Sequence, residues 1–132
     1  MHAKLLLLIT AYLEAATGLF LLLVPNVVFA VLLGGEHAAV DTIFVGRLTG
    51  AALLAIGIAS WIARADTLTH AYLGLLTGIF VYDAVAAMLL AFAGAVFGMT
   101  GILLWPAVAL HAVLAIWCLS CLREFLIKWT PR

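Results

Sequence analysis

Four ionisable residues lie inside the long apolar segments of this sequence, one in each segment: Glu14, Arg47, Asp83 and His111. A charge in the hydrocarbon core of a membrane costs roughly 2.5–3.5 kcal/mol on insertion scales. We therefore expect these residues to contact one another or water. A buried set of two carboxylates, a guanidinium and an imidazole can share protons. Burial favours the neutral form of such groups, whereas a neighbouring opposite charge favours the charged form. The set predicts ligand binding or proton exchange inside a membrane.

The composition identifies the class of protein that holds these residues. The chain has 132 residues, of which 68% are hydrophobic and 9% are charged, whereas soluble domains are about half apolar and about a quarter charged. At ~20 residues per span, the length allows about four transmembrane helices. We expect an all-α, polytopic membrane protein, built as one four-helix transmembrane domain over residues 1–132. The lipid bilayer is its expected partner, and the formal net charge of zero argues against nucleic acid.

The spans are predicted at about residues 5–24, 42–63, 71–92 and 104–122. Pro25 ends the first span, because proline lacks an N–H donor and clashes with the preceding turn. Residues 27–33 are apolar but too few to cross a membrane, so a short interfacial or re-entrant helix is expected there. Residues 123–132 are interpreted as a basic cytoplasmic tail.

The basic residues predict the orientation. Apart from Arg47, all lysines and arginines fall on one side of a four-span topology, at Lys4, Arg64, Arg123, Lys128 and Arg132. Loops rich in these residues stay in the cytoplasm. We therefore expect a multi-pass protein of the bacterial inner membrane with both termini cytoplasmic.

The depths of the polar residues overlap. At ~1.5 Å per residue, Glu14 and Asp83 lie ~14–18 Å from the cytoplasmic side, and Arg47 and His111 lie ~8–10 Å from the outer side of a core ~30 Å thick. Tyr82 points about 100° away from Asp83 and is expected on the neighbouring wall. We predict one ligand- or proton-binding site, in which Arg47 anchors an anionic or carbonyl group and the carboxylates and His111 exchange protons. A structural clasp between the helices is the alternative.

Motifs for metals and cofactors are weak in this sequence. Cys118 and Cys121 form a CxxC pair, but there is no second pair, and the apolar surroundings favour a packing role. His70 and His111 are too far apart along the membrane normal to ligate haem together. No nucleotide-binding, hydrolase or zinc-helix motif occurs. We expect no metal site and no haem, and a quinone is the cofactor that the site leaves open.

Pairs of glycines spaced four residues apart predict close helix packing. They serve either the packing of this chain or the seam of a homodimer or larger membrane complex. The pairs are Gly46 and Gly50, Gly74 and Gly78, and Gly94 and Gly98.

The layout resembles the small four-span bacterial membrane proteins grouped as DoxX-like, and related uncharacterised families. The resemblance rests on a first helix ending at a proline (LLLVPNVVFAVLLGG), a glycine-rich second helix with an early arginine (GRLTGAALLAIGIASWIAR) and a last helix with a histidine (LHAVLAIW). It implies the four-helix fold and carries over no catalytic residue. Some DoxX-like members resemble quinone-linked oxidoreductase subunits.

Three functions are compatible with these residues. The first is a membrane subunit or ligand-binding protein for a small hydrophobic or anionic molecule. The second is a proton-coupled small-molecule transporter working as a homodimer, and the third is a quinone-facing redox subunit. The sequence leaves open whether the protein is an enzyme.

Overall fold

The protein is all-helical over the residues that its computed structural model describes, which are 2–35, 38–66 and 69–129. The helices are α1 (His2–Leu23), α2 (Pro25–Leu33), α3 (Val40–Ala63), α4 (His70–Val96) and α5 (Leu104–Trp129). Four of them are long and apolar enough to cross a membrane, over Ala3–Leu23, Val40–Ala63, His70–Val96 and Leu104–Ile127. The predicted fold class, a four-helix multi-pass membrane protein, is confirmed.

Helix boundaries follow the local sequence. Pro25 is the first residue of α2, where its missing N–H is not needed. Gly34 ends α2 in the left-handed conformation, with φ of 85°, and its N–H donates to the carbonyl of Ala30 at 3.0 Å. Helix α5 continues to Trp129, through most of the predicted basic tail. Residues 130–132 of that tail lie outside the described residues.

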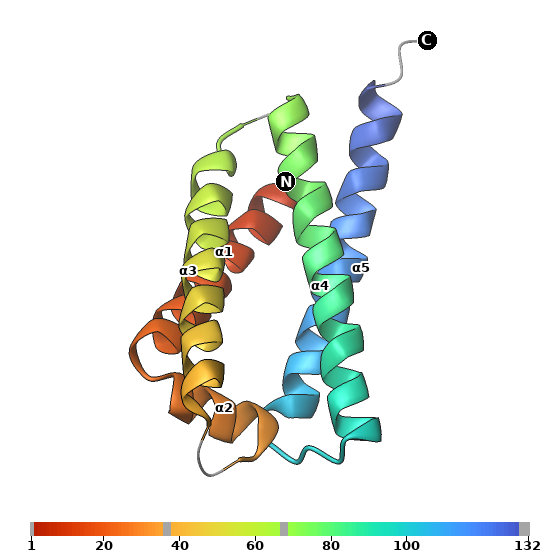
Figure 1. Ribbon diagram of the computed structural model, residues 1–132. Helices are drawn as coiled ribbons and strands as arrows, with labels where there is room; N and C mark the ends of the chain where they lie inside the picture. Colours follow the sequence, from red (N-terminus) through yellow and green to blue (C-terminus); the bar gives the residue numbers. More distant parts are fainter. Residues whose placement is uncertain (1, 36–37, 67–68, 130–132) are drawn as a thin grey trace.

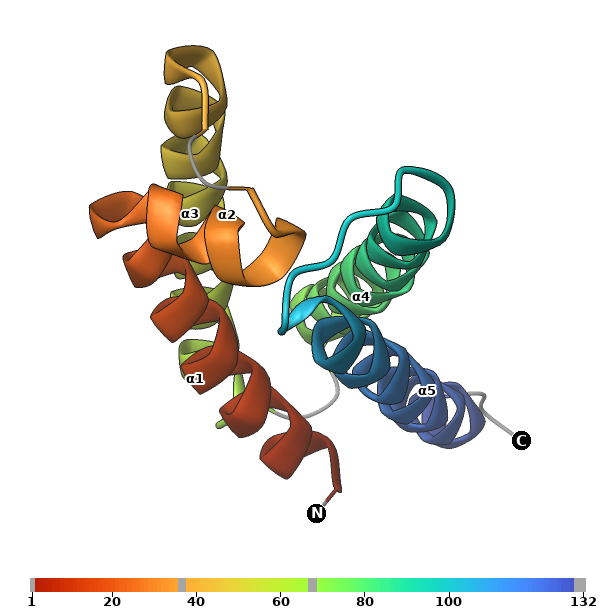
Figure 2. The same ribbon diagram turned by 90° about the horizontal axis from the view of Figure 1, so that it is seen from below.

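The four long helices form two pairs (Figure 1). Helix α1 packs mainly on α3, and α4 packs mainly on α5. Seen along the bundle, the pairs stand apart like the two sides of a V, and α2 lies across one end (Figure 2). Each pair consists of long helices that follow one another in the sequence, so the closest packing is local along the chain.

The two pairs are joined at both ends of the bundle. At the end where α1 begins and α5 finishes, a hydrophobic core cluster unites α1 with α4 and α5. Its central members are Leu6, Leu7, Tyr72, Leu76, Leu114, Cys118 and Phe125. At the other end, the N–H of Leu103 donates to the carbonyl of Val31 at 2.9 Å. That carbonyl belongs to the last turn of α2, where no intrahelical donor is available.

Glycines set the close approach of α1 and α3. A methyl group added at Gly50 would lie 2.7 Å from the carbonyl oxygen of Gly18, and one added at Gly57 would lie 2.8 Å from the backbone nitrogen of Ala15. The expected packing role within the chain is therefore met on α3. Gly74 and Gly78 differ, because nothing lies within 4 Å of a methyl group added at either position.

Candidate functional site

A cavity of about 480 Å³ lies between the two helix pairs. Its walls are mostly apolar side chains of α1, α2, α4 and α5, and its polar residues are Glu14, Thr17, Tyr82 and His111. The α2 residues Val28 and Val31 line the end beside the α2 bridge, whereas Glu14, Tyr82 and His111 lie farther along their helices, toward the core cluster. The volume suits a small molecule, because ligand pockets typically measure about 300–1,000 Å³.

His111, which lines the cavity, is hydrogen-bonded to Asp83, which is not among the lining residues. The distance from Nδ1 of His111 to Oδ1 of Asp83 is 2.7 Å, and Asp83 is 0% exposed. Asp83 lies on the face of α4 that also buries Tyr72, Leu76 and Ile79. It therefore occupies a position in the α4–α5 interface that an apolar residue would normally fill. A buried carboxylate there holds the imidazole ring in one orientation.

Glu14 approaches this pair from the opposite helix pair. It is only 3% exposed, and one of its carboxylate oxygens lies within 4.8 Å of ligand atoms of both Asp83 and His111. Tyr82 lines the same cavity as Glu14. The Tyr82 ring also meets the His111 ring edge to face, with centroids 5.6 Å apart. Consecutive helical positions point about 100° apart, so Tyr82 faces the cavity while Asp83 faces α5.

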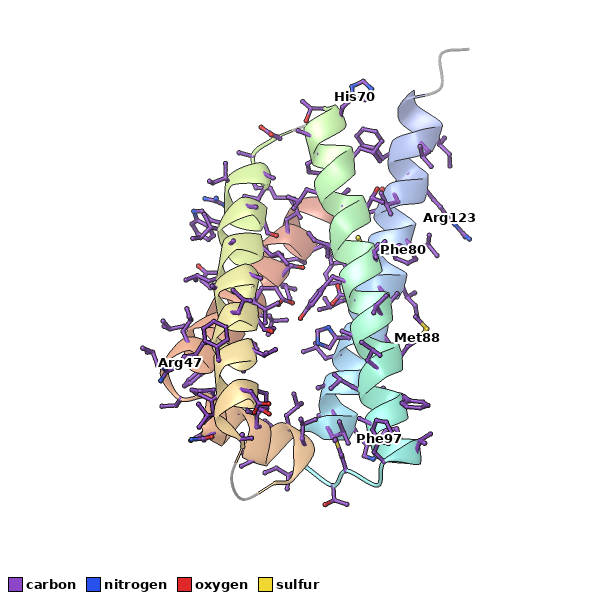
Figure 3. The ribbon with its side chains drawn as sticks, viewed as in Figure 1. Arg47, His70, Phe80, Met88, Phe97 and Arg123 are labelled. Carbon is purple, nitrogen blue, oxygen red and sulfur yellow. The ribbon has the colours of Figure 1, made fainter. Side chains whose placement is uncertain are left out.

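Arg47 is not part of this group. Its side chain is exposed and points away from α4 and α5 (Figure 3). The face of α3 that packs inward consists of Gly46, Gly50, Leu53, Gly57 and Ser60, and Arg47 lies about 100° around the helix from Gly46. Of the cavity-lining residues in the described part of the chain, none comes from α3. The structure thus brings Glu14, Tyr82, Asp83 and His111 together and separates Arg47 from them.

This separation leaves the site without the positive side chain that the sequence predicted for it. The group contains two carboxyl groups and one imidazole, and no lysine or arginine lines the cavity in the described ranges. Two carboxylates this close in a low-dielectric interior repel each other strongly. Protons or a bound cation must therefore balance their charge. The site can accept hydrogen bonds and bind cations, but it offers no arginine to an anion.

Sequence reasoning missed the contribution of α2 to the site. The α2 segment was expected to form a short interfacial or re-entrant helix and was given no part in the site, whereas Val27, Val28, Val31 and Leu32 line the cavity. The length of α2 could have indicated this contribution. A helix of nine residues spans only ~14 Å, so it must lie against the long helices to bury its apolar side chains.

Cys118 and Cys121 are free and buried in the core cluster, as a packing role requires. The Cys118 thiol donates to the carbonyl of Leu76 at 3.1 Å.

No family model, curated protein or solved structure matches this chain.

Proposed function

We propose that this chain is a membrane ligand-binding protein that holds a small amphipathic molecule between its two helix pairs. The observation that carries the proposal is one apolar cavity of about 480 Å³ whose polar lining includes Glu14, Tyr82 and His111. The apolar part of the ligand would pack against α2 and the neighbouring walls of α1 and α5. Its polar head would contact the three polar side chains.

The hydrogen-bonding groups of the site favour a head that donates. An ionised carboxylate can only accept hydrogen bonds, so an ionised Asp83 beside a neutral His111 fixes the proton on Nδ1 and leaves Nε2 as an acceptor. Glu14 is a second acceptor in the cavity lining. A hydroxyl or an amine complements this arrangement. A quinol, with its two hydroxyl groups, fits the same acceptors and keeps a quinone-facing role within the proposal.

Binding of a hydrophobic amine tests the proposal. Purified protein in nanodiscs is titrated with a radiolabelled aryl-alkyl amine, and a short-tailed quinol is added as a competitor. We expect saturable binding with one site per chain. Glu14→Gln should weaken binding of the amine at least tenfold, because it removes the charge that the ammonium group contacts; losing one charge-assisted hydrogen bond of ~1.5–3 kcal/mol corresponds to this effect.

Two tryptophan substitutions on α2 form the matched test of the cavity itself. Val28 lines the cavity, whereas Asn26 is exposed and does not. Val28→Trp should fill the volume and abolish saturable binding, and Asn26→Trp should leave it unchanged. Equal binding by the two variants, or uptake that only follows the amount of lipid, would refute a ligand site between the pairs.

A proton-coupled transporter is the second candidate, and the Asp83–His111 hydrogen bond favours it. Proton carriers inside membranes are chains of acidic and histidine side chains, and here Glu14 lies within 4.8 Å of such a pair from the other side of the cavity. A ligand that displaces a proton from Glu14 would couple its own binding to proton release. A homodimer is part of this candidate, with the exposed glycines Gly74 and Gly78 as a seam between copies.

For the cellular setting we propose the bacterial inner membrane, with both termini cytoplasmic. At the end of α3, the Arg64 guanidinium carbon lies 3.5 Å above the centre of the Trp61 ring. Basic and aromatic residues of this kind are typical of the membrane–water interface. This end of α3 is the one where α1 begins and α5 ends (Figure 1), in keeping with basic residues gathered on one side.

A further inference from the structure

The polar end of the cavity is also a set of metal ligands. Glu14, Asp83 and His111 each offer one ligand atom, and these three atoms all lie within 4.8 Å of one another. We propose that they bind one divalent transition-metal ion, such as Zn²⁺. The inference uses the polar end of the proposed ligand site and goes beyond it, because no organic ligand is needed for the metal to bind. It also departs from the sequence, which predicted no metal site.

The distances allow a metal ion with small side-chain movements. Zinc binds nitrogen and oxygen ligands at ~2.0–2.1 Å, so two ligand atoms on one tetrahedral ion are ~3.4 Å apart. The ligand atoms start no more than 4.8 Å apart, so each pair has to change its separation by no more than about 1.4 Å. The flexible Glu14 side chain, which enters from the other helix pair, can supply most of this movement.

Asp83 gives an independent sign that a partner belongs in the site. Its Oδ1 atom is bonded to His111, but its Oδ2 atom is buried and has no hydrogen-bond partner among the described residues. A buried carboxylate oxygen without a partner is costly. A cation that takes the place of the proton between Nδ1 of His111 and Asp83, and that Glu14 also contacts, would satisfy this oxygen.

The charges of the three side chains match a divalent ion. Two ionised carboxylates and a neutral imidazole carry two negative charges, so a divalent cation makes the group neutral. Neutrality matters because uncompensated charge is expensive in a membrane interior. The imidazole selects the type of ion, since Mg²⁺ and Ca²⁺ prefer oxygen ligands alone, whereas Zn²⁺ and its neighbours accept nitrogen.

Three protein ligands would leave a coordination position open on a tetrahedral ion. Glu14 and His111 line the cavity, so water or the head of a cavity ligand could take that position. The protein would then hold the metal with residues from both helix pairs, and the metal would bridge α1 to α4 and α5.

Metal binding is tested with the metal alone, on protein without an affinity tag that has been stripped with a chelator. Zn²⁺ is titrated by calorimetry, and Co²⁺ serves as a visible-absorption probe that Zn²⁺ displaces. We expect one ion per chain, no displacement by Mg²⁺, and an affinity that rises with pH, because the ligands must lose their protons to bind. Glu14→Gln and His111→Gln should each weaken Zn²⁺ binding at least tenfold.

Two substitutions of the same residue types serve as controls outside the cavity. Glu124 and His70 are exposed, and Glu124→Gln and His70→Ala should bind Zn²⁺ as the wild type does. Size-exclusion profiles and metal-free melting curves identify any variant that fails to fold, and Glu14→Gln breaks no hydrogen bond of the Asp83–His111 pair. No Zn²⁺ binding by the wild type, or equal affinity in Glu14→Gln and Glu124→Gln, overturns the proposal.

The amine titration separates this result from the proposed function. Val28→Trp fills the end of the cavity beside α2, away from the metal ligands, so it should abolish amine binding and retain Zn²⁺. If the wild type binds the amine saturably but does not bind Zn²⁺, the metal proposal alone is refuted. If the wild type binds Zn²⁺ but does not bind the amine saturably, the metal site is supported and the proposed binding of an organic ligand is refuted.

Discussion

Gly57 holds α1 at the distance that places Glu14 in the cavity. A methyl group added at Gly57 would lie 2.8 Å from the backbone nitrogen of Ala15 and 3.0 Å from the carbonyl oxygen of Ala11. Both neighbours are backbone atoms of α1, so no flexible side chain can move aside. Gly57→Ala should therefore separate α1 from α3. Since Ala15 is the next residue after Glu14, the carboxylate should move with it.

The magnitude follows from a comparison with Gly78, where nothing lies within 4 Å of an added methyl group. Van der Waals contacts with carbon are optimal at ~3.5–4.0 Å, so the contact at Gly57 is about 0.7 Å too short. Overpacking of this kind costs typically about 1–3 kcal/mol. Replacing glycine by alanine in a helix stabilises it by roughly 1 kcal/mol, and this gain is the same in both variants. Gly57→Ala should thus be about 1–3 kcal/mol less stable than Gly78→Ala.

The stabilities are compared by steric trapping or by titration with sodium dodecyl sulfate, followed by tryptophan fluorescence. Gly78→Ala should match the wild type or exceed it by up to about 1 kcal/mol. In the same preparations, amine or Zn²⁺ binding should weaken in Gly57→Ala and not in Gly78→Ala. Equal stability of the two variants, within about 0.5 kcal/mol, would mean that the glycine contact does not set the spacing of α1 and α3.

Three further predictions concern charge and orientation. Arg47→Gln should change stability by less than about 0.5 kcal/mol, as exposed sites usually do, and should leave amine binding intact in a nanodisc titration; a large loss would return Arg47 to the site. Amine affinity should fall as the pH is lowered, because protons compete with the ammonium group for the Glu14 carboxylate, and this dependence should largely vanish in Glu14→Gln; a flat wild-type curve would exclude proton coupling. Reporter fusions at the two ends of the chain should both read cytoplasmic, and two periplasmic signals would reverse the proposed topology.

The helices were predictable from the sequence because each boundary carries a local signal. Pro25 and Gly34 bracket α2, polar residues separate the first three long apolar runs, and a glycine-rich stretch separates the last two. The last two helices are longer than the predicted spans, since α4 extends to Val96 and α5 to Trp129, beyond the span ends expected at about residues 92 and 122. Helices continue past the membrane interior wherever the sequence permits, so hydropathy marks the spanning part and not the helix end.

The polar site was only partly predictable, for a geometric reason. The rise per residue gives the depth of a side chain, and depth alone correctly grouped Glu14, Asp83 and His111. Depth says nothing of direction around the helix, and Arg47 has the right depth but the wrong direction. The inward face of α3 carries Gly46, Gly50 and Gly57, of which the sequence indicated Gly46 and Gly50 as a packing pair. Choosing that face required knowing that α3 packs on α1 through glycines and does not reach the cavity.

The division into two helix pairs also bears on how the chain enters the membrane. Asp83 and His111 belong to the same hairpin, α4–α5, and they are joined by a 2.7 Å hydrogen bond. This hairpin can therefore insert with its carboxylate already paired, which lowers the cost of burying it. Glu14 belongs to the segment that is synthesised first, and its partners are made only later. During synthesis, α1 therefore precedes the residues that lie beside Glu14 in the folded chain.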